Sequence, residues 1–172
     1  MDIRYVDDND DLLLISDIYE QSWRMTYKGM LPSRYLKKLP VGNWKYRINR
    51  FGSRSMVMVS GGEYIGTVSF GKSSIEKYSE WGEVYSIYLL PRYTGMGLGK
   101  RLMDSALLEL KKQGYSKVLL FALEKNLAAR KFYENYGFTA SGDMMKKKFG
   151  HKMVTEVMYA IELEQDIRMP DL

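Results

Sequence analysis

The sequence predicts a mixed α/β (α+β) fold in which helices cover a mixed sheet, and three observations support this. A chain of 172 residues is long enough for one compact core and short for two. Helical and β-rich segments alternate along it without a repeat or linker. No apolar run approaches the roughly 18 residues of a membrane span. We therefore expect residues 1–172 to form one soluble domain, with a frayed tail at 164–172.

The first half of the chain is predicted to open with a strand and continue with helices. Residues 3–6 (IRYV) are typical of a short strand, and the acidic run at 7–11 supplies N-cap chemistry for a helix carrying Leu13, Leu14, Ile18 and Tyr19. A break at 29–32 leads to a second short helix, and NWKYRINRF is typical of a third. Two β-rich runs then flank Gly61 and Gly62, a pair suited to a tight hairpin turn.

The second half alternates strands with longer helices. EVYSIYLL is typical of a strand that Pro91 stops, and a helix follows whose apolar positions recur every four residues until Gly114: Leu98, Leu102, Ala106 and Leu110. KVLLFAL is typical of a central strand covered on both faces. A helix over about 127–136 precedes FTASGDMMKKKF and KMVTEVMYAIEL, which we expect to close the chain as a hairpin.

A glycine-rich turn, PRYTGMGLGKRLM, connects the strand to the long helix. Residues without Cβ let a ligand approach the backbone, and the unpaired N–H groups of a helix N-terminus attract negative charge. The turn therefore favours a phosphate group, with Gly95, Gly97 and Gly99 as N–H donors and Arg92, Lys100 and Arg101 as nearby cations. A Walker loop would need glycine at Thr94, and a dinucleotide fingerprint would need glycine at Lys100, so neither pattern fits.

Two motifs resemble the GNAT superfamily of acetyl-CoA-dependent N-acetyltransferases. RYTGMG matches the signature [R/Q]-x-x-G-x-[G/A], and NLAARKFYENYGF resembles the segment N-x-x-A-x-x-x-Y-x-x-x-G-F. The order of elements fits this fold from about residue 3 to 163. The resemblance implies a mostly antiparallel sheet of about seven strands with helices on both faces. It also implies that the strand before the glycine turn splays from its neighbour at a bulge.

The resemblance implies acetyl-CoA as co-substrate. N–H groups of residues 95–100 would clasp the pyrophosphate, and pantetheine would lie along the preceding strand like an added strand. A backbone N–H of that strand would meet the oxyanion. The expected cofactor-binding residues are Ile87, Tyr88, Leu89, Arg92, Gly95, Met96, Gly97, Leu98, Gly99, Lys100 and Asn126.

Acetyl transfer to an amine needs a base for the nucleophile and an acid for the departing thiolate. Glu83 is similar in position to a general base of the family. An equal alternative is that Glu83 is only a solvated carboxylate at the end of the strand and that water acts as the base. Glu80 and Tyr85 are further candidates for the base. Strand alternation would place Glu83 and Tyr85 on one face with Ile87, unless a bulge intervenes.

Tyr133 is the expected general acid. It lies seven residues, or two helical turns, after Asn126, so both side chains can meet one ligand. The resemblance gives its phenol the role of protonating the sulfur of coenzyme A. The alternative is core packing, because Ala129, Phe132 and Tyr136 complete an apolar stripe.

The sequence does not identify the acceptor amine. SWRMTYKGMLPSRYL is similar to the segment that walls the acceptor side in the spermidine/spermine (PaiA-like) subgroup, which suggests a polyamine near Trp23, Tyr27, Tyr35 and Tyr85. Glu76, Glu80 and Glu83 could supply carboxylates. Peptide N-termini and protein lysines are the alternatives.

The amino-acid composition limits which other classes of function fit this sequence. The chain has no cysteine and one histidine, which gives no support to a metal site or a thiol nucleophile. The first residues, MDIRYVDDNDD, have neither the basic start nor the apolar stretch of a secretory signal, so we expect a cytoplasmic protein. The net charge of +5 would suit an anionic ligand, but no nucleic-acid recognition motif is visible. A CoA-binding regulatory protein without catalysis is the main rival class, and a homodimer is compatible with the sequence.

Overall fold

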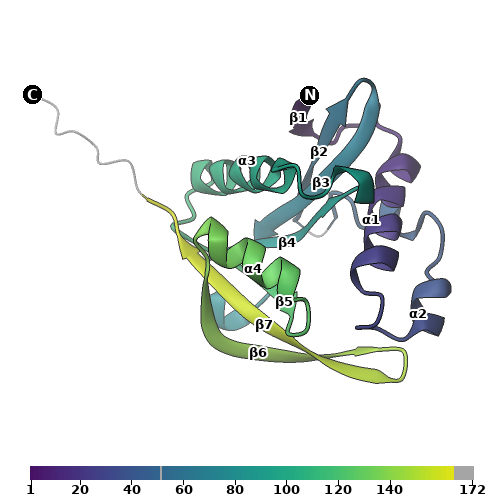
Figure 1. The fold of residues 1–172 in the computed structure, drawn as a ribbon. Helices are drawn as coiled ribbons and strands as arrows, with labels where there is room; N and C mark the ends of the chain where they lie inside the picture. Colours follow the sequence, from purple (N-terminus) through teal and green to yellow (C-terminus); the bar gives the residue numbers. More distant parts are fainter. Residues whose placement is uncertain (51, 165–172) are drawn as a thin grey trace, which may run out of the picture.

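A seven-stranded sheet forms the frame of the protein in a computed structural model that describes residues 1–50 and 52–164 (Figure 1). The strands are β1 (Asp2–Tyr5), β2 (Arg54–Ser60), β3 (Glu63–Lys72), β4 (Gly82–Leu89), β5 (Lys117–Leu123), β6 (Thr139–Phe149) and β7 (Lys152–Glu162). They are ordered β1-β2-β3-β4-β5-β7-β6, and every neighbouring pair is antiparallel except β4 and β5. The predicted mixed, mostly antiparallel sheet is confirmed.

Helices cover both faces of this sheet. They are α1 (Leu12–Thr26), α2 (Ser33–Lys37), α3 (Leu98–Lys112) and α4 (Leu127–Tyr136), with short 3-10 turns η1 (Asn43–Tyr46), η2 (Glu76–Tyr78) and η3 (Pro91–Tyr93). One hydrophobic cluster joins the sheet to α3 and α4, and a second joins it to α1, α2 and η1. Figure 1 shows the two helix pairs on opposite sides of the strands. No helix in these described ranges is both long and apolar enough to cross a membrane.

Local sequence explains where the main helices begin and which faces they bury. Asp11 caps α1 by accepting hydrogen bonds from the N–H groups of Leu13 and Leu14, at 2.9 and 3.3 Å. These two leucines remain about half exposed, because the buried stripe of α1 runs instead through Ile15, Ile18 and Tyr19. In α3 the predicted positions 98, 102, 106 and 110 are all buried.

Two segments differ from, or lie beyond, the sequence prediction. The expected third helix shortens to η1, because Asn49 adopts a positive φ of 55° that cannot continue a helix. The frayed tail expected at 164–172 lies outside the described residues, apart from Glu164. By contrast, the hairpin turn is confirmed, since Gly61 and Gly62 have φ values of 58° and 83°.

β4 and β5 diverge in the middle of the sheet. β4 pairs with β3 along its whole length, but it pairs with β5 only at Gly82 and Glu83. Tyr85 is the extra residue of a bulge, because its neighbours Val84 and Ser86 face consecutive residues of β3. The splay and bulge implied by the family resemblance are therefore present.

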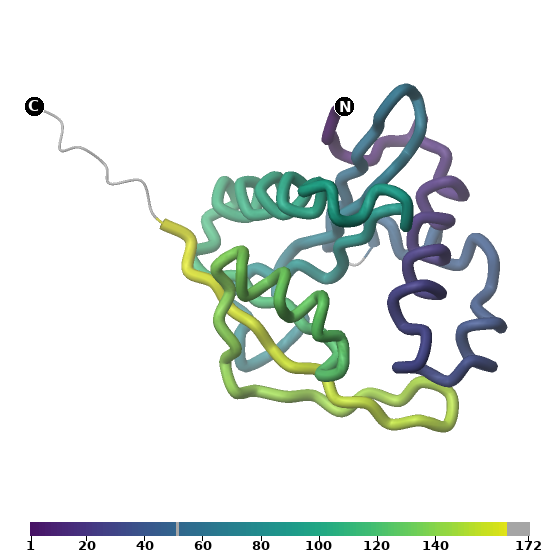
Figure 2. Tube along the Cα trace, viewed as in Figure 1, coloured from purple at the N-terminus to yellow at the C-terminus, as the bar shows by residue number. Residues whose placement is uncertain are grey.

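The β6–β7 hairpin reaches across to the segment that follows α1, as Figure 2 shows. Lys152 donates a hydrogen bond to the carbonyl of Met30 at 2.8 Å, and the rings of Tyr35 and Phe149 meet edge to face at 5.6 Å. The hairpin thus connects the β5–β7 side of the sheet to the segment that follows α1.

Candidate active site

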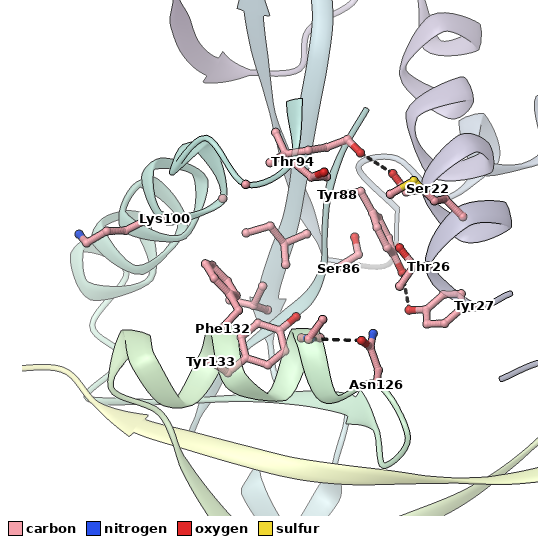
Figure 3. Close-up of a pocket in the computed structure, with 18 of the residues that line it drawn as sticks. Ser22, Thr26, Tyr27, Ser86, Tyr88, Thr94, Lys100, Asn126, Phe132 and Tyr133 are labelled. Carbon is pink, nitrogen blue, oxygen red and sulfur yellow. Dashed lines mark hydrogen bonds between the residues drawn. The ribbon is translucent and has the colours of Figure 1, made fainter. Parts of the chain in front are cut away.

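A cavity of about 560 Å³ opens where β4 and β5 diverge (Figure 3). Its walls come from β4, the glycine turn, Phe121 of β5, α4 and the end of α1. Eight of the residues predicted to bind cofactor line it: Ile87, Tyr88, Leu89, Gly95, Gly97, Gly99, Lys100 and Asn126. Three segments that are distant in the sequence, 22–27, 84–100 and 121–133, are therefore brought to one space.

The edge of β4 that faces this cavity carries free backbone groups. The N–H of Leu90 donates to the carbonyl of Ile65 on the β3 side, at 2.8 Å. In an antiparallel pair the residues that bond to the partner strand alternate with those that point away, so the N–H and C=O groups of Ile87 and Leu89 point toward the gap. Ser22 of α1 donates to the Leu89 carbonyl at 2.7 Å. The rest of this edge can accept an extended ligand as an added strand.

The glycine turn leaves its backbone open. Gly95 and Gly97 both have φ of 77°, and a Cβ at either position would meet no atom within 4 Å. Gly97 begins α3 without a side-chain cap, so the first N–H groups of the helix are available to a ligand. Gly99 serves packing, because its Cβ would lie 3.4 Å from the ring of Phe132 on α4.

The cations near the turn are engaged by acidic or sulfur partners. Arg92 forms an ion pair with Glu63, and Lys100 lies 3.0 Å from the carboxylate of Asp104 and points away from the cavity in Figure 3. Arg101 contacts the sulfur of Met1 at 3.0 Å. Three residues predicted to bind cofactor do not line the cavity: Arg92, the exposed Met96 and the buried Leu98.

Tyr133 and Asn126 lie on the same face of α4, as their spacing predicts. Asn126 caps the helix, since its Oδ1 accepts a hydrogen bond from the N–H of Ala129 at 3.1 Å. The half-buried Tyr133 directs its hydroxyl into the cavity (Figure 3) and has no hydrogen-bond partner within the described residues. Its ring also packs against Phe132 at 5.4 Å, and burial raises the pKa of the phenol. The phenol therefore keeps its proton at neutral pH.

Glu83 faces a second cavity, of about 300 Å³, which borders the first cavity at β4. The buried carboxylate accepts hydrogen bonds from the N–H and the hydroxyl of Ser74, at 2.7 and 2.8 Å. Burial raises the pKa of Glu83, while the Ser74 bonds and nearby Lys147 act in the opposite direction.

The bulge changes which residues of β4 share a face. Because Tyr85 is an extra residue, Ile87 packs toward α3 while Ser86 and Tyr88 fall on the side of Glu83. The bulge therefore intervenes, and the one-face arrangement of simple alternation does not extend to Ile87. Tyr85 itself donates a hydrogen bond to the carbonyl of Lys72 and lines both cavities.

The second cavity is walled by rings and charged groups. Of the residues predicted at the acceptor site, Trp23, Tyr27 and Tyr85 line it, but Tyr35 does not. The exposed Glu76 and Glu80 also lie elsewhere. Sequence reasoning missed the following wall residues: Tyr19, Trp44, Arg47, Phe121, Lys147, Phe149 and Glu156. No local signal marks them, because they come from segments that only the folded sheet brings together.

The two cavities meet at the bulge of β4. Both are lined by Tyr27, Ser86 and Tyr88, and the hydroxyls of Tyr27 and Tyr88 lie 3.3 Å apart at the junction. An acyl donor in the first cavity and a nucleophile in the second could thus meet beside Glu83 and Tyr133. Within residues 1–50 and 52–164, no group of three or more His, Cys, Asp and Glu side chains could hold a metal ion.

The splayed strands and the open turn fit a coenzyme A thioester, with the turn suited to its diphosphate, and so define the class of acyl-CoA-dependent transferases. The chain belongs to the acetyltransferase (GNAT) family, whose sequence model matches residues 15–138. Members of this family use acetyl-CoA as acyl donor. The resemblance drawn from the two motifs is confirmed.

Individual relatives agree. The uncharacterized N-acetyltransferase YuaI of Bacillus subtilis is 31% identical over 132 residues, covering 74% of each chain. A spermidine N(1)-acetyltransferase of Thermoplasma acidophilum is 25% identical over 154 residues, covering 81% of this chain and 92% of that one. The crystal structure of the PaiA N-acetyltransferase from Thermoplasma acidophilum with coenzyme A superposes with a TM-score of 0.72 at 18% identity, over 95% of this chain and 100% of that one.

Proposed function

We propose that the protein transfers an acetyl group from acetyl-CoA to a primary amine by direct attack in a ternary complex. The observation that carries this proposal is the meeting of two cavities at the β4 bulge, with a buried carboxylate on one side and a free phenol on the other. The thioester lies in the first cavity, held by the free edge of β4 and the turn at Gly95 and Gly97. The amine enters from the second.

Each step of the proposed acetyl transfer can be assigned to a residue that lines one of the two cavities. Glu83 accepts the proton that the amine loses as its nitrogen bonds to the acetyl carbon. The N–H of Ile87 or Leu89 faces the carbonyl oxygen, which becomes negative as the bond forms. When the carbon–sulfur bond breaks, Tyr133 donates its proton to the sulfur. Its raised pKa keeps the proton available until that moment.

A polyamine is one candidate acceptor class. It is supported by one distant relative, the spermidine N(1)-acetyltransferase of Thermoplasma acidophilum. Peptide N-termini and protein lysines are the other candidates for the same chemistry. The absence of cysteine suits a reducing compartment such as the cytoplasm.

Amine-dependent release of free coenzyme A is the test. The purified protein is incubated with acetyl-CoA and a panel of polyamines, peptides and small amines, and the thiol is titrated with a chromogenic disulfide. At least one amine is expected to release thiol and to yield an acetylated product by mass spectrometry. Binding of acetyl-CoA without release by any amine would instead favour a non-catalytic CoA-binding protein.

A further inference from the structure

Some of the charged side chains that line the second cavity have hydrogen-bond or ion-pair partners in the protein, and others do not. Two carboxylates and two cations contribute: Glu83, Glu156, Arg47 and Lys147. Glu156 lies 3.7 Å from Lys147, so these two charges compensate each other. Glu83 is held by both donors of Ser74. Both carboxylates therefore already have partners in the protein.

Arg47 has no such partner. Its side chain is exposed and forms no hydrogen bond or ion pair with any residue that the structure describes. A guanidinium offers five N–H donors in a rigid fork that matches a carboxylate or phosphate. The indole N–H of Trp23, in the same wall, is also buried without a partner among these residues. The groups in the cavity wall that still lack a partner are thus hydrogen-bond donors, and one of them, the guanidinium of Arg47, is positively charged.

The segment that carries Arg47 is fixed to α1. The buried carboxylate of Glu20 accepts a hydrogen bond from the N–H of Gly42 at 2.7 Å. Ser16 accepts another from the N–H of Trp44 at 3.2 Å, and Arg47 donates its own N–H to the Trp44 carbonyl at 2.8 Å. The backbone of Arg47 is therefore positioned before any ligand arrives, which lowers the entropy cost of binding.

The remaining wall is aromatic and the space is small. Trp44 packs against Trp23 at 5.5 Å and against Tyr19 at 6.0 Å, and Phe121 and Phe149 add further rings. A volume of about 300 Å³ is at the lower end of the range for ligand pockets. These walls suit a compact acceptor with an apolar body.

We infer that the acceptor is a small primary amine that also carries an anionic group, and that Arg47 binds this anion while the amine lies toward Glu83. The inference rests on the proposed acetyl transfer and departs from the polyamine that one distant relative suggests. Glu83 could receive one ammonium group of a polyamine, but the other positive charges would lie beside Arg47 and Lys147, and the remaining carboxylate, Glu156, is already paired with Lys147. An amine with a carboxylate or phosphate leaves each charge paired.

Matched acceptors test this directly. The value of kcat/KM is compared between L-phenylalanine and phenethylamine, between L-leucine and isopentylamine, and between O-phosphoethanolamine and ethanolamine, with spermidine alongside. In at least one pair the anionic member is expected to be better by roughly tenfold or more. The pair that shows it identifies the anion as carboxylate or phosphate. Equal or faster turnover of spermidine or of all the neutral amines would overturn the inference.

Arg47→Gln links the preference to one side chain. It is expected to lower kcat/KM for the anionic acceptor by about 10- to 100-fold. The matched neutral amine should change less than about twofold, because it makes no contact that depends on this charge. The control is Arg50→Gln, an exposed arginine three residues on that lines neither cavity. A preference that survives in Arg47→Gln would contradict the assignment.

A binding measurement separates this inference from the proposed reaction. Tryptophan fluorescence, which reports on Trp23 and Trp44 in the cavity wall, follows titration with N-acetyl-L-phenylalanine and with N-acetyl-O-phosphoethanolamine. At least one is expected to bind the native protein and to lose about tenfold or more in affinity in Arg47→Gln. If no amine is acetylated but this binding depends on Arg47, the proposed catalysis fails and the anion site stands. Absence of Arg47-dependent binding would refute the anion site.

Discussion

The carboxylate of Glu83 accepts two hydrogen bonds from Ser74, one from the backbone N–H at 2.7 Å and one from the hydroxyl at 2.8 Å. These bonds favour the ionised carboxylate, whereas burial favours its neutral form and has the larger effect. The resulting pKa lies above the ordinary value for glutamate. A base must be ionised to act, so kcat/KM should rise with pH through this raised pKa.

Ser74→Ala should move the acidic limb of the pH–rate profile to higher pH. The variant removes the hydroxyl bond but keeps the backbone bond, so the charged form of Glu83 loses support and its pKa rises further. The measurement is kcat/KM from pH 5 to 9 with the best acceptor. Glu83→Gln is the reference, and it should lower activity by roughly 10²-fold or more and abolish this limb. A limb that stays in place in Glu83→Gln would assign the base elsewhere.

Tyr133→Phe should lower turnover by roughly 10²- to 10⁴-fold while acetyl-CoA still binds. The change removes only the hydroxyl, and the ring still packs against Phe132. Steady-state kinetics and calorimetry measure the two quantities. Tyr136→Phe is the matched control, because Tyr136 lies one turn further on α4, bonds to Asp104 and does not line the cavity. Similar turnover in the two variants would mean that Tyr133 serves packing alone.

Gly97→Val should weaken acetyl-CoA binding by roughly tenfold or more, because its side chain would occupy the approach to the N–H groups of the turn. Gly114→Val is a closely matched control at the other end of α3. Gly114 also has a positive φ, of 93°, and open space at its Cβ, but it does not line the cavity. Both variants carry similar backbone strain, of about 1–3 kcal/mol. Calorimetry should therefore show lost affinity only in Gly97→Val, and equal affinities would count against the turn as the diphosphate site.

Asp10→Asn should destabilise the fold without affecting the active site. Arg4 donates to both oxygens of Asp10, at 2.8 and 2.6 Å, and Tyr64 donates to one of them at 2.8 Å. The bonds from Arg4 are the largest cause of the lowered pKa of this carboxyl. Because Arg4 is partly exposed, we expect a loss of only about 1–2 kcal/mol at pH 7.

The pH dependence of that loss follows from the lowered pKa. The ionised carboxyl contributes its stability above its ordinary pKa of about 3.9, and the contribution is lost as pH falls through the folded-state value. Urea unfolding should therefore show a difference between native and Asp10→Asn at pH 7 that shrinks toward pH 2. Asp8→Asn, at an exposed neighbour, is the control and should change stability little at either pH. A constant difference at all pH values would assign the effect to lost packing.

Local sequence was sufficient for most of the fold and for one side of the site. The hairpin at Gly61 and Gly62, the cap at Asp11 and the buried stripe of α3 depend on residues a few positions apart, so periodicity and turn chemistry predict them. The same is true of the open turn at Gly95 and Gly97 and of the spacing of Asn126 and Tyr133 on one helix face. These features of the first cavity are encoded within single turns or helices.

Only the tertiary structure decided which residues line the second cavity. The bulge at Tyr85 depends on the register between β3 and β4, and it reversed the face on which Ile87 was expected. Arg47 and Glu156 are 109 positions apart and have no motif, yet they line one cavity because α1 fixes the segment at η1 and the sheet places β7 beside β5. Short-range spacing determines which backbone can hold a phosphate. Long-range packing determines which charges an amine will meet, and a single sequence does not encode that in any local pattern.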